Sequence, residues 1–167
     1  LLLVAPAARA GQFDGWRYRA RIAFTNPVKG ALTNFPALVV LGPNTIAGFA
    51  YTQFNSLADG ADLRFADASQ SVELNYEIEK WDTNGDSYVW VQVPTIAGTN
   101  DFICSYWGRE AGAAACTTNG SVWTNGFRGV WHFSGVGATQ ADATVSANAA
   151  TPHGTGVTGS VGMVARA

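Results

Sequence analysis

Residues 72–93 read VELNYEIEKWDTNGDSYVWVQV, and this stretch decides the fold. Apolar and polar side chains alternate up to a turn at residues 82–87 that contains Asn84-Gly85, and the alternation resumes after the turn. A period of two on both sides of an Asn-Gly turn predicts an antiparallel β-hairpin. The face expected to meet the core holds Val72, Leu74, Tyr76, Ile78, Val89, Val91 and Val93.

The register of this hairpin follows from folding it symmetrically about its turn. That register places Trp81 opposite Tyr88, Glu79 opposite Trp90 and Ile78 opposite Val91. Apolar residues then meet apolar residues on the side that faces the core, as a buried sheet face requires.

Four further stretches have strand-like patterns, namely residues 16–24, 35–41, 62–66 and 102–107. In the first, Arg17, Arg19 and Arg21 alternate with apolar residues, which is typical of a half-buried strand. The second is a continuous apolar run and predicts a buried strand. Many short strands and few helical periods predict an all-β protein. We expect an antiparallel, jelly-roll-like β-sandwich over residues 11–120, ending in a linker at 111–120, and the first part of a second sandwich over 121–167.

The composition excludes several classes of protein. Of 167 residues, 47% are hydrophobic and 13% charged, which is a globular and not a disordered composition. The formal net charge is −2, with acidic and basic residues interspersed, so we expect no nucleic-acid partner and no attraction to an anionic membrane. No apolar run after the N-terminal segment is long enough to span a bilayer.

The N-terminal segment resembles the end of a signal peptide. Residues 1–10 are an apolar run followed by small residues, and Ala8-Arg9-Ala10 fits the small-x-small pattern of a cleavage site. An ordinary apolar strand is the alternative. We expect a signal-peptide remnant at 1–10, an extracytoplasmic location (secreted, periplasmic or outer-surface), and a longer parent protein of which this is the front part.

Cysteine and metal chemistry are sparse. Cys104 and Cys116 either pair in an oxidising compartment or remain two buried thiols, and with two distant histidines they form no zinc pattern. Asp82, Asn84 and Asp86 resemble the front of a calcium loop but lack its later bidentate Glu. Because these residue types also build ordinary turns, we expect no metal and no cofactor, with these three as the calcium candidates.

Two readings compete for the carboxylates of the hairpin. Glu77, Glu79 and Asp82 form the motif E-x-E-x-x-D, which is similar to the motif E-x-D-x-x-E of some sandwich-fold glycosidases. Alternate residues of a strand lie about 7 Å apart, and this separation of two carboxylates suits a glycosidase. The other reading is the solvated face of a strand, which we favour because the residue types are shuffled. His132 has no Ser or Cys motif to support a triad, so we expect no catalytic residues.

The same face predicts a binding site. By parity, Glu77, Glu79 and Trp81 face away from the core, and the turn brings Tyr88 and Trp90 to that side. Aromatic rings beside carboxylates are how proteins hold sugars, with the ring stacking on C–H groups and the acids binding hydroxyls. The alternative is a second layer of structure that covers this face.

Several motifs together carry a resemblance to a known family. They are Trp16-x-Tyr18-Arg19, Asn34-Phe35-Pro36-x-Leu38-Val39, residues 59–65 (DGADLRF), Tyr76-Glu77-Ile78-Glu79-x-Trp81 and Val89-Trp90-Val91-x-Val93-Pro94. This order resembles the exported bacterial domain-of-unknown-function family 2341. Val130-Trp131-His132-Phe133, with Asp142, Asn148, His153-Gly154 and Gly162, is similar to the start of a concanavalin A-like, laminin-G-type lectin or glucanase domain.

The resemblance implies a β-sandwich followed by a lectin-like sandwich at 121–167, and it implies no known activity. Members of the family are surface proteins, sugar-associated proteins or N-terminal extensions of TolQ/ExbB-type proton-channel proteins. We therefore expect a non-catalytic extracytoplasmic module that binds a glycan or a cell surface. The alternatives are a periplasmic sensing or scaffold part of a TolQ/ExbB-type biopolymer transport protein, and a glycoside hydrolase or its accessory domain.

Export with cleavage after Ala10 is the first testable prediction. N-terminal sequencing of the protein recovered from its producing cells is expected to begin at Gly11, because Ala8-Arg9-Ala10 precedes that bond. A cytoplasmic protein that retains residues 1–10 would contradict it.

Overall fold

The computed structural model describes residues 11–25, 29–110, 120–133 and 138–154. They form two three-stranded antiparallel sheets with strand orders β1-β6-β3 and β2-β5-β4. The strands are β1 (Trp16–Ala23), β2 (Leu32–Leu41), β3 (Arg64–Ala66), β4 (Tyr76–Lys80), β5 (Ser87–Ile96) and β6 (Phe102–Arg109). Within the described ranges the one helical element is a 3-10 turn, η1 (Tyr51–Gln53), and no helix there is long and apolar enough to cross a membrane.

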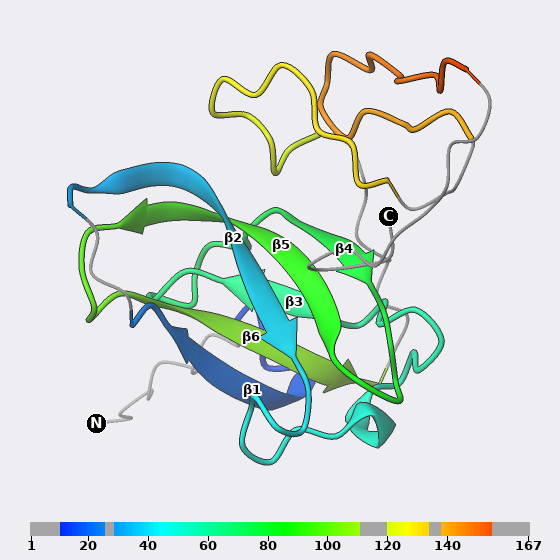
Figure 1. Ribbon diagram of the computed structural model, residues 1–167. Helices are drawn as coiled ribbons and strands as arrows, with labels where there is room; N and C mark the ends of the chain where they lie inside the picture. The colour runs from blue at the N-terminus through cyan, green and yellow to red at the C-terminus, as the bar shows by residue number, and fades with distance from the viewer. Residues whose placement is uncertain (1–10, 26–28, 111–119, 134–137, 155–167) are drawn as a thin grey trace, which may run out of the picture.

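One hydrophobic core lies between the two sheets (Figure 1). Side chains of β2 and β5 enter it at every second position, as the alternating pattern of the sequence predicts. Ile103 and Trp107 of β6 and Phe65 of β3 meet them from the other sheet. The prediction of an all-β antiparallel fold is confirmed, whereas the jelly-roll connectivity and the second sandwich stay predictions.

Two expectations about buried positions are wrong. Residues 35–41 are not buried throughout, because β2 is an edge strand with only one face in the core. Leu38 and Val40 are only half-buried, and the side chain of Phe35 is 40% exposed. Val72 is 54% exposed because β4 begins only at Tyr76, so Val72 lies outside the paired part of the hairpin.

The predicted register of the hairpin is also wrong, although the hairpin itself is confirmed. Ile78 lies opposite Val89 and not opposite Val91, and the pairing shifts by one residue between Ile78 and Lys80. Up to Ile78 the difference is two residues, so the inside and outside faces of β4 are those that the alternation predicts. The extra residue lies between Ile78 and Lys80, so Glu79 stays on the outer face and the two faces are reversed from Lys80 on.

Trp81 therefore turns toward the core and not outward as the sequence predicted. Its ring packs edge-on against Tyr51 and Phe54, with ring centroids 5.4 and 5.0 Å apart, and its indole N–H donates to the Leu57 carbonyl at 2.8 Å. The ring also lies over Gly60, which has a positive φ of 64°; a Cβ there would come within 2.6 Å of the indole. Residues 45–58, irregular in the sequence pattern, thus provide aromatic rings that close one end of the core.

Asp62 ties this end of the molecule together. Asp62 is only 2% exposed. Its carboxylate accepts four backbone N–H groups, two from residues 55–56 and two from residues 108–109. The Asp62 carbonyl accepts the Trp16 indole N–H at 2.7 Å. Because a buried carboxylate is costly without donors, these four hydrogen bonds hold the loop after η1 against the end of β6.

Asp142 plays a similar role in the segment after residue 120. Its carboxylate accepts N–H groups from Val130, Thr144 and Asn148 and the Thr144 hydroxyl. Against the opposing effect of burial, these donors lower the Asp142 pKa to about 2. The indole N–H of Trp131 donates to the Asn148 carbonyl at 2.8 Å, so residues 128–133 and 138–150 are held side by side.

The role of Asp62 yields a matched test. Asp62→Asn keeps one acceptor but turns an amide toward backbone donors, so we expect the free energy of unfolding to fall by about 3 kcal/mol. Asp59→Asn, in the exposed turn where Asp59 accepts Ser56 Oγ and the Ala61 N–H, is expected to lower it by less than about 1 kcal/mol. Urea denaturation measures both, and equal losses would contradict the role of Asp62.

Candidate functional site

The outer face of sheet β2-β5-β4 is covered by residues 120–133. In Figure 1 this segment, drawn in yellow, lies above β4 and β5. Trp123 is buried against the sheet, the Gln92 amide donates to Thr124 Oγ1, and the Asn125 amide donates to the Thr33 carbonyl at 2.9 Å. The segment therefore contacts all three strands of this sheet.

Five residues form what we call the glutamate–histidine cluster: Glu77 and Glu79 of β4, Trp90 of β5, and Trp123 and His132 of the covering segment. Each carboxylate accepts one indole N–H at 3.0 Å, Glu77 from Trp123 and Glu79 from Trp90. His132 lies between the two carboxylates. Its Nε2 is 3.0 Å from Glu77 Oε1, an ion-pair contact without an aligned hydrogen bond, and its Nδ1 contacts Glu79 Oε2.

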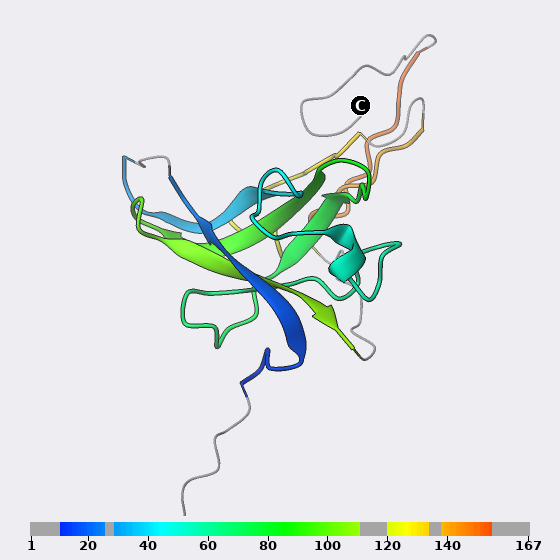
Figure 2. The same ribbon diagram turned by 90° about the horizontal axis from the view of Figure 1, so that it is seen from below.

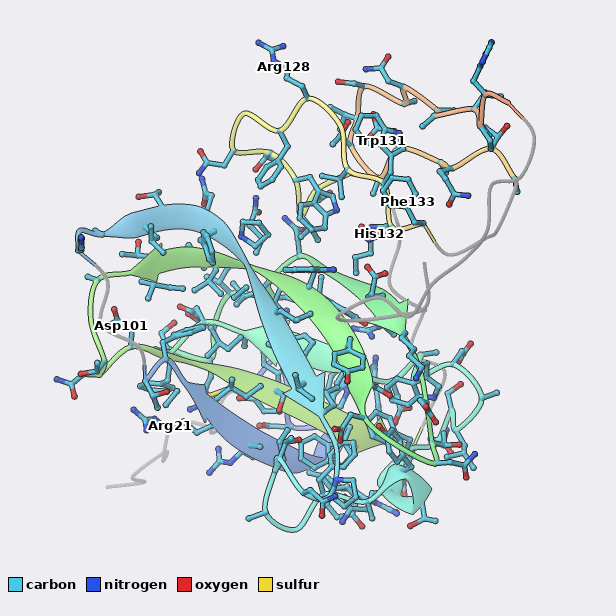
Figure 3. All side chains as sticks on the ribbon, viewed as in Figure 1. Arg21, Asp101, Arg128, Trp131, His132 and Phe133 are labelled. Atoms are coloured by element: carbon cyan, nitrogen blue, oxygen red, sulfur yellow. The ribbon has the colours of Figure 1, made fainter. Side chains whose placement is uncertain are left out.

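Aromatic packing surrounds the charges. The rings of Trp90 and Trp123 meet at 5.4 Å and 61°, Trp123 and His132 at 5.8 Å, and Trp123 and Phe127 at 5.4 Å. Figure 3 shows His132 between the covering segment and the sheet, whereas Arg128 points away from the sheet. The two carboxylates thus sit under an aromatic layer that belongs to the chain itself.

The electrostatics of the cluster favour a charged imidazole. The carboxylates of Glu77 and then Glu79 raise the pKa of His132 from 6.5 to about 9, against the opposing effect of burial. His132 is therefore an imidazolium at neutral pH, and its positive charge stabilises two carboxylates that would repel each other. Glu77, Glu79 and His132 each have a partner within the chain. The chemical role of the cluster is therefore to hold residues 120–133 on the sheet.

A second feature lies on the outer face of sheet β1-β6-β3. A hollow of about 400 Å³ is lined by residues 11–14, Trp16, Arg17, Arg19, Gln70 and Tyr106. Phe13 stacks on Tyr106 at 4.4 Å and forms a small second core with Ala66 and Cys104. Gln70 Oε1 accepts the Tyr106 hydroxyl at 2.6 Å and an Arg19 N–H at 3.2 Å.

The family model described as "Domain of unknown function (DUF2341)" matches residues 59–145, more than half of the chain. The chain belongs to this family. All five residues of the glutamate–histidine cluster lie within the matched range. No curated protein and no solved structure matches the chain.

This DUF2341 structure does not gather the five residues that the sequence placed on a ligand face. Glu77, Glu79 and Trp90 do share the outer face of their sheet, but Glu77 is only 6% exposed and lies beneath Trp123. Tyr88 is half-buried on the same face, opposite Lys80. Trp81 is partly buried and packs against the core because of the irregularity in β4. The described residues thus have the second layer that was the alternative interpretation.

Sequence reasoning missed His132 and Trp123 as partners of the two glutamates. From the sequence His132 was considered as a catalytic candidate without triad partners, and in the structure it lies outside the described strands and contacts Glu77. The signal that pointed to them was indirect: two carboxylates and a Trp on an outward face need a cover or a ligand, and Trp123 and His132 lie in the only aromatic-rich stretch after residue 120.

The remaining candidates of the DUF2341 domain have ordinary roles where they are described. Asp82 forms an ion pair with Lys80 at 2.9 Å and caps the Asn84 N–H, which holds the hairpin turn. Among the described residues no group of three His, Cys, Asp or Glu is arranged to hold a metal. Cys104 is a buried free thiol whose pKa burial raises, and Cys116 lies outside the described residues.

The cluster predicts a pH dependence with a definite sign. Because the folded pKa of His132 is raised, its stabilising contribution is complete below pH 6.5 and is lost as the pH rises to about 9. The loss amounts to about 3 kcal/mol at most. Hydrogen exchange of residues 120–133 is therefore expected to accelerate between pH 6.5 and 9, after correction for the intrinsic exchange rate.

The control for this experiment is His132→Gln, which cannot carry the charge. It is expected to exchange fast at every pH, and its curve is expected to lack the change between pH 6.5 and 9. If the wild type and His132→Gln have the same corrected profile, the imidazolium does not hold the segment.

Proposed function

We propose that this DUF2341 protein is a non-catalytic recognition module that acts outside the cytoplasm and binds a glycan or another cell-surface ligand. The observation that carries the proposal is that the outer faces of the two sheets differ. The outer face of β2-β5-β4 holds the chain's own residues 120–133, whereas the outer face of β1-β6-β3 has an open hollow. Figure 2 views the molecule from the side of β1.

The glutamate–histidine cluster supports the non-catalytic part of the proposal. A glycosidase needs one carboxyl group that protonates the leaving oxygen and a second that attacks or activates water. Here Glu77 and Glu79 each accept an indole N–H and share the imidazolium of His132. No observation on the described residues favours the hydrolase alternative, because neither carboxylate has a side open to a sugar.

The hollow supports the recognition part. Its volume of about 400 Å³ lies in the range of pockets that bind small ligands or single sugar rings. Its lining combines an aromatic surface from Trp16 with hydrogen-bonding groups of Gln12, Gln70 and Arg19, which is the combination that sugar hydroxyls and C–H groups need. Cleavage after Ala10 would leave the new α-ammonium of Gly11 beside Asp14 on the wall of this hollow.

We also propose that residues 11–120 form a jelly-roll-like sandwich and that a concanavalin A-like domain begins in 121–167. The scaffold alternative, a periplasmic part of a TolQ/ExbB-type protein, is favoured by one observation. Residues 120–133 are fixed to β4 by charge pairs and to β5 by ring contacts. A segment fixed in this way would hold the residues after it in a defined orientation relative to the two sheets.

A glycan array of neutral and acidic oligosaccharides tests the recognition function. Gln70→Ala removes the side chain that Arg19 and Tyr106 contact on the exposed wall of the hollow, so we expect the affinity for any bound glycan to fall about tenfold. Tyr88→Ala, on the outer face of the other sheet, is the control and is expected to leave the affinity unchanged.

Two results would overturn the proposal. One is that the wild type binds neither an oligosaccharide on the array nor the surface of whole cells. The other is that Tyr88→Ala loses binding while Gln70→Ala, folded by circular dichroism, keeps it; that result would move the site to sheet β2-β5-β4.

A further inference from the structure

Three arginines form a row on the outer face of β1. Arg17, Arg19 and Arg21 occupy alternate positions, and all three are exposed. Alternate residues of a strand lie about 7 Å apart, so the row presents positive charge along an extended line. Arg19 pairs in register with Tyr106 of β6 and Arg21 with Cys104, which places the row beside the hollow.

Two of these arginines have no carboxylate partner among the described residues. Arg17 pairs with Glu110, and both side chains of that pair are largely exposed. Arg19 donates to the Gln70 amide oxygen. Arg21 lies over the Phe102 ring at 4.2 Å and donates to the Asn100 carbonyl at 3.4 Å. Among the described residues, Arg19 and Arg21 are therefore charged side chains without an ion-pair partner, in a chain whose net charge is −2.

The acidic side chains near the row accept backbone hydrogen bonds within their own turns. Asp14 accepts the Gly11 N–H. Asp67 accepts the N–H groups of Ser71 and Val72, and Asp101 accepts those of Ala97 and Gly98. Each of these carboxylates accepts backbone N–H groups of its own loop, and among the described residues none of them forms an ion pair with Arg19 or Arg21.

We propose that Arg19 and Arg21 bind carboxylate groups of a linear polysaccharide that contains uronic acids, with the sugar nearest Arg19 entering the hollow beside Gln70. This inference rests on the proposed recognition function and names its ligand class. A guanidinium binds a planar carboxylate through two parallel N–H groups, and a row along a strand matches a polymer with repeated charges. A nucleic acid fits less well, because Asp14 lies on the wall of the hollow and the chain is acidic overall.

The test uses three galactose-based polymers: polygalacturonate, its methyl ester and neutral galactan. We expect the wild type to bind polygalacturonate at least tenfold more tightly than either uncharged polymer in isothermal titration. The double variant Arg19→Gln/Arg21→Gln is expected to lose at least tenfold of that affinity. Arg19→Lys, which keeps the charge but not the two parallel donors, is expected to retain only part of it.

Arg128→Gln provides the matched control, because it removes the same charge from an exposed arginine. Figure 3 shows Arg128 and Arg21 on opposite sides of the molecule, so this variant is expected to bind polygalacturonate within twofold of the wild type. An equal loss in Arg128→Gln and the double variant would indicate general attraction of a polyanion and would overturn the inference.

The remaining outcomes separate this inference from the function on which it rests. If the wild type binds galactan or the methyl ester as tightly as polygalacturonate and Gln70→Ala weakens that binding, the recognition function stands and the acidic ligand is wrong. Tighter binding of a sulfated galactan or of single-stranded DNA than of polygalacturonate would also overturn the carboxylate assignment. If no glycan binds, the acidic-ligand inference fails, and if the protein also binds no cell surface, the recognition function fails with it.

Discussion

The buried carboxylate of Asp62 is the interaction on which the arrangement of the elements depends. It accepts backbone N–H groups from the loop after η1 and from the end of β6, while its own carbonyl accepts the indole of Trp16 at the start of β1. Three segments that are distant in the sequence therefore meet at one residue. The hollow beside Trp16 and the aromatic end of the core lie next to this point, so both depend on the position that Asp62 fixes.

Burial of charge also explains the covered sheet. Two carboxylates on one face of β4 would be expensive to remove from water without partners. The protein supplies them from a single segment and a neighbouring strand: two indole N–H groups and an imidazolium whose pKa is about 9. Each donor must reach a particular oxygen, so the cluster fixes the position of residues 120–133 on the sheet. Apolar contacts, which have no such direction, would fix that position less strictly.

The hairpin illustrates how far the sequence predicts this structure. A strict period of two identifies the strands, the turn and the outward positions of Glu77, Glu79 and Trp90, because those properties are local. The irregularity between Ile78 and Lys80 leaves no mark in the pattern, and it turns Trp81 from the outer face to a partly buried position against the core. The contacts of Glu77 with Trp123 and His132 span 46 and 55 residues and depend on tertiary packing, so spacing along the chain does not reveal them.

The position of β1 at the edge of its sheet has an evolutionary consequence. Arg19 and Arg21 are exposed, and the fold draws little stability from their contacts with a carbonyl and an amide oxygen. Substitutions there are nearly neutral for folding, whereas a change to Glu77 leaves a buried partner without its counter-charge. We therefore expect the chemistry displayed on β1 to tolerate substitution more readily than Glu77 and its partners on the other sheet. The same asymmetry makes β1 the natural position for engineering a new specificity on this scaffold.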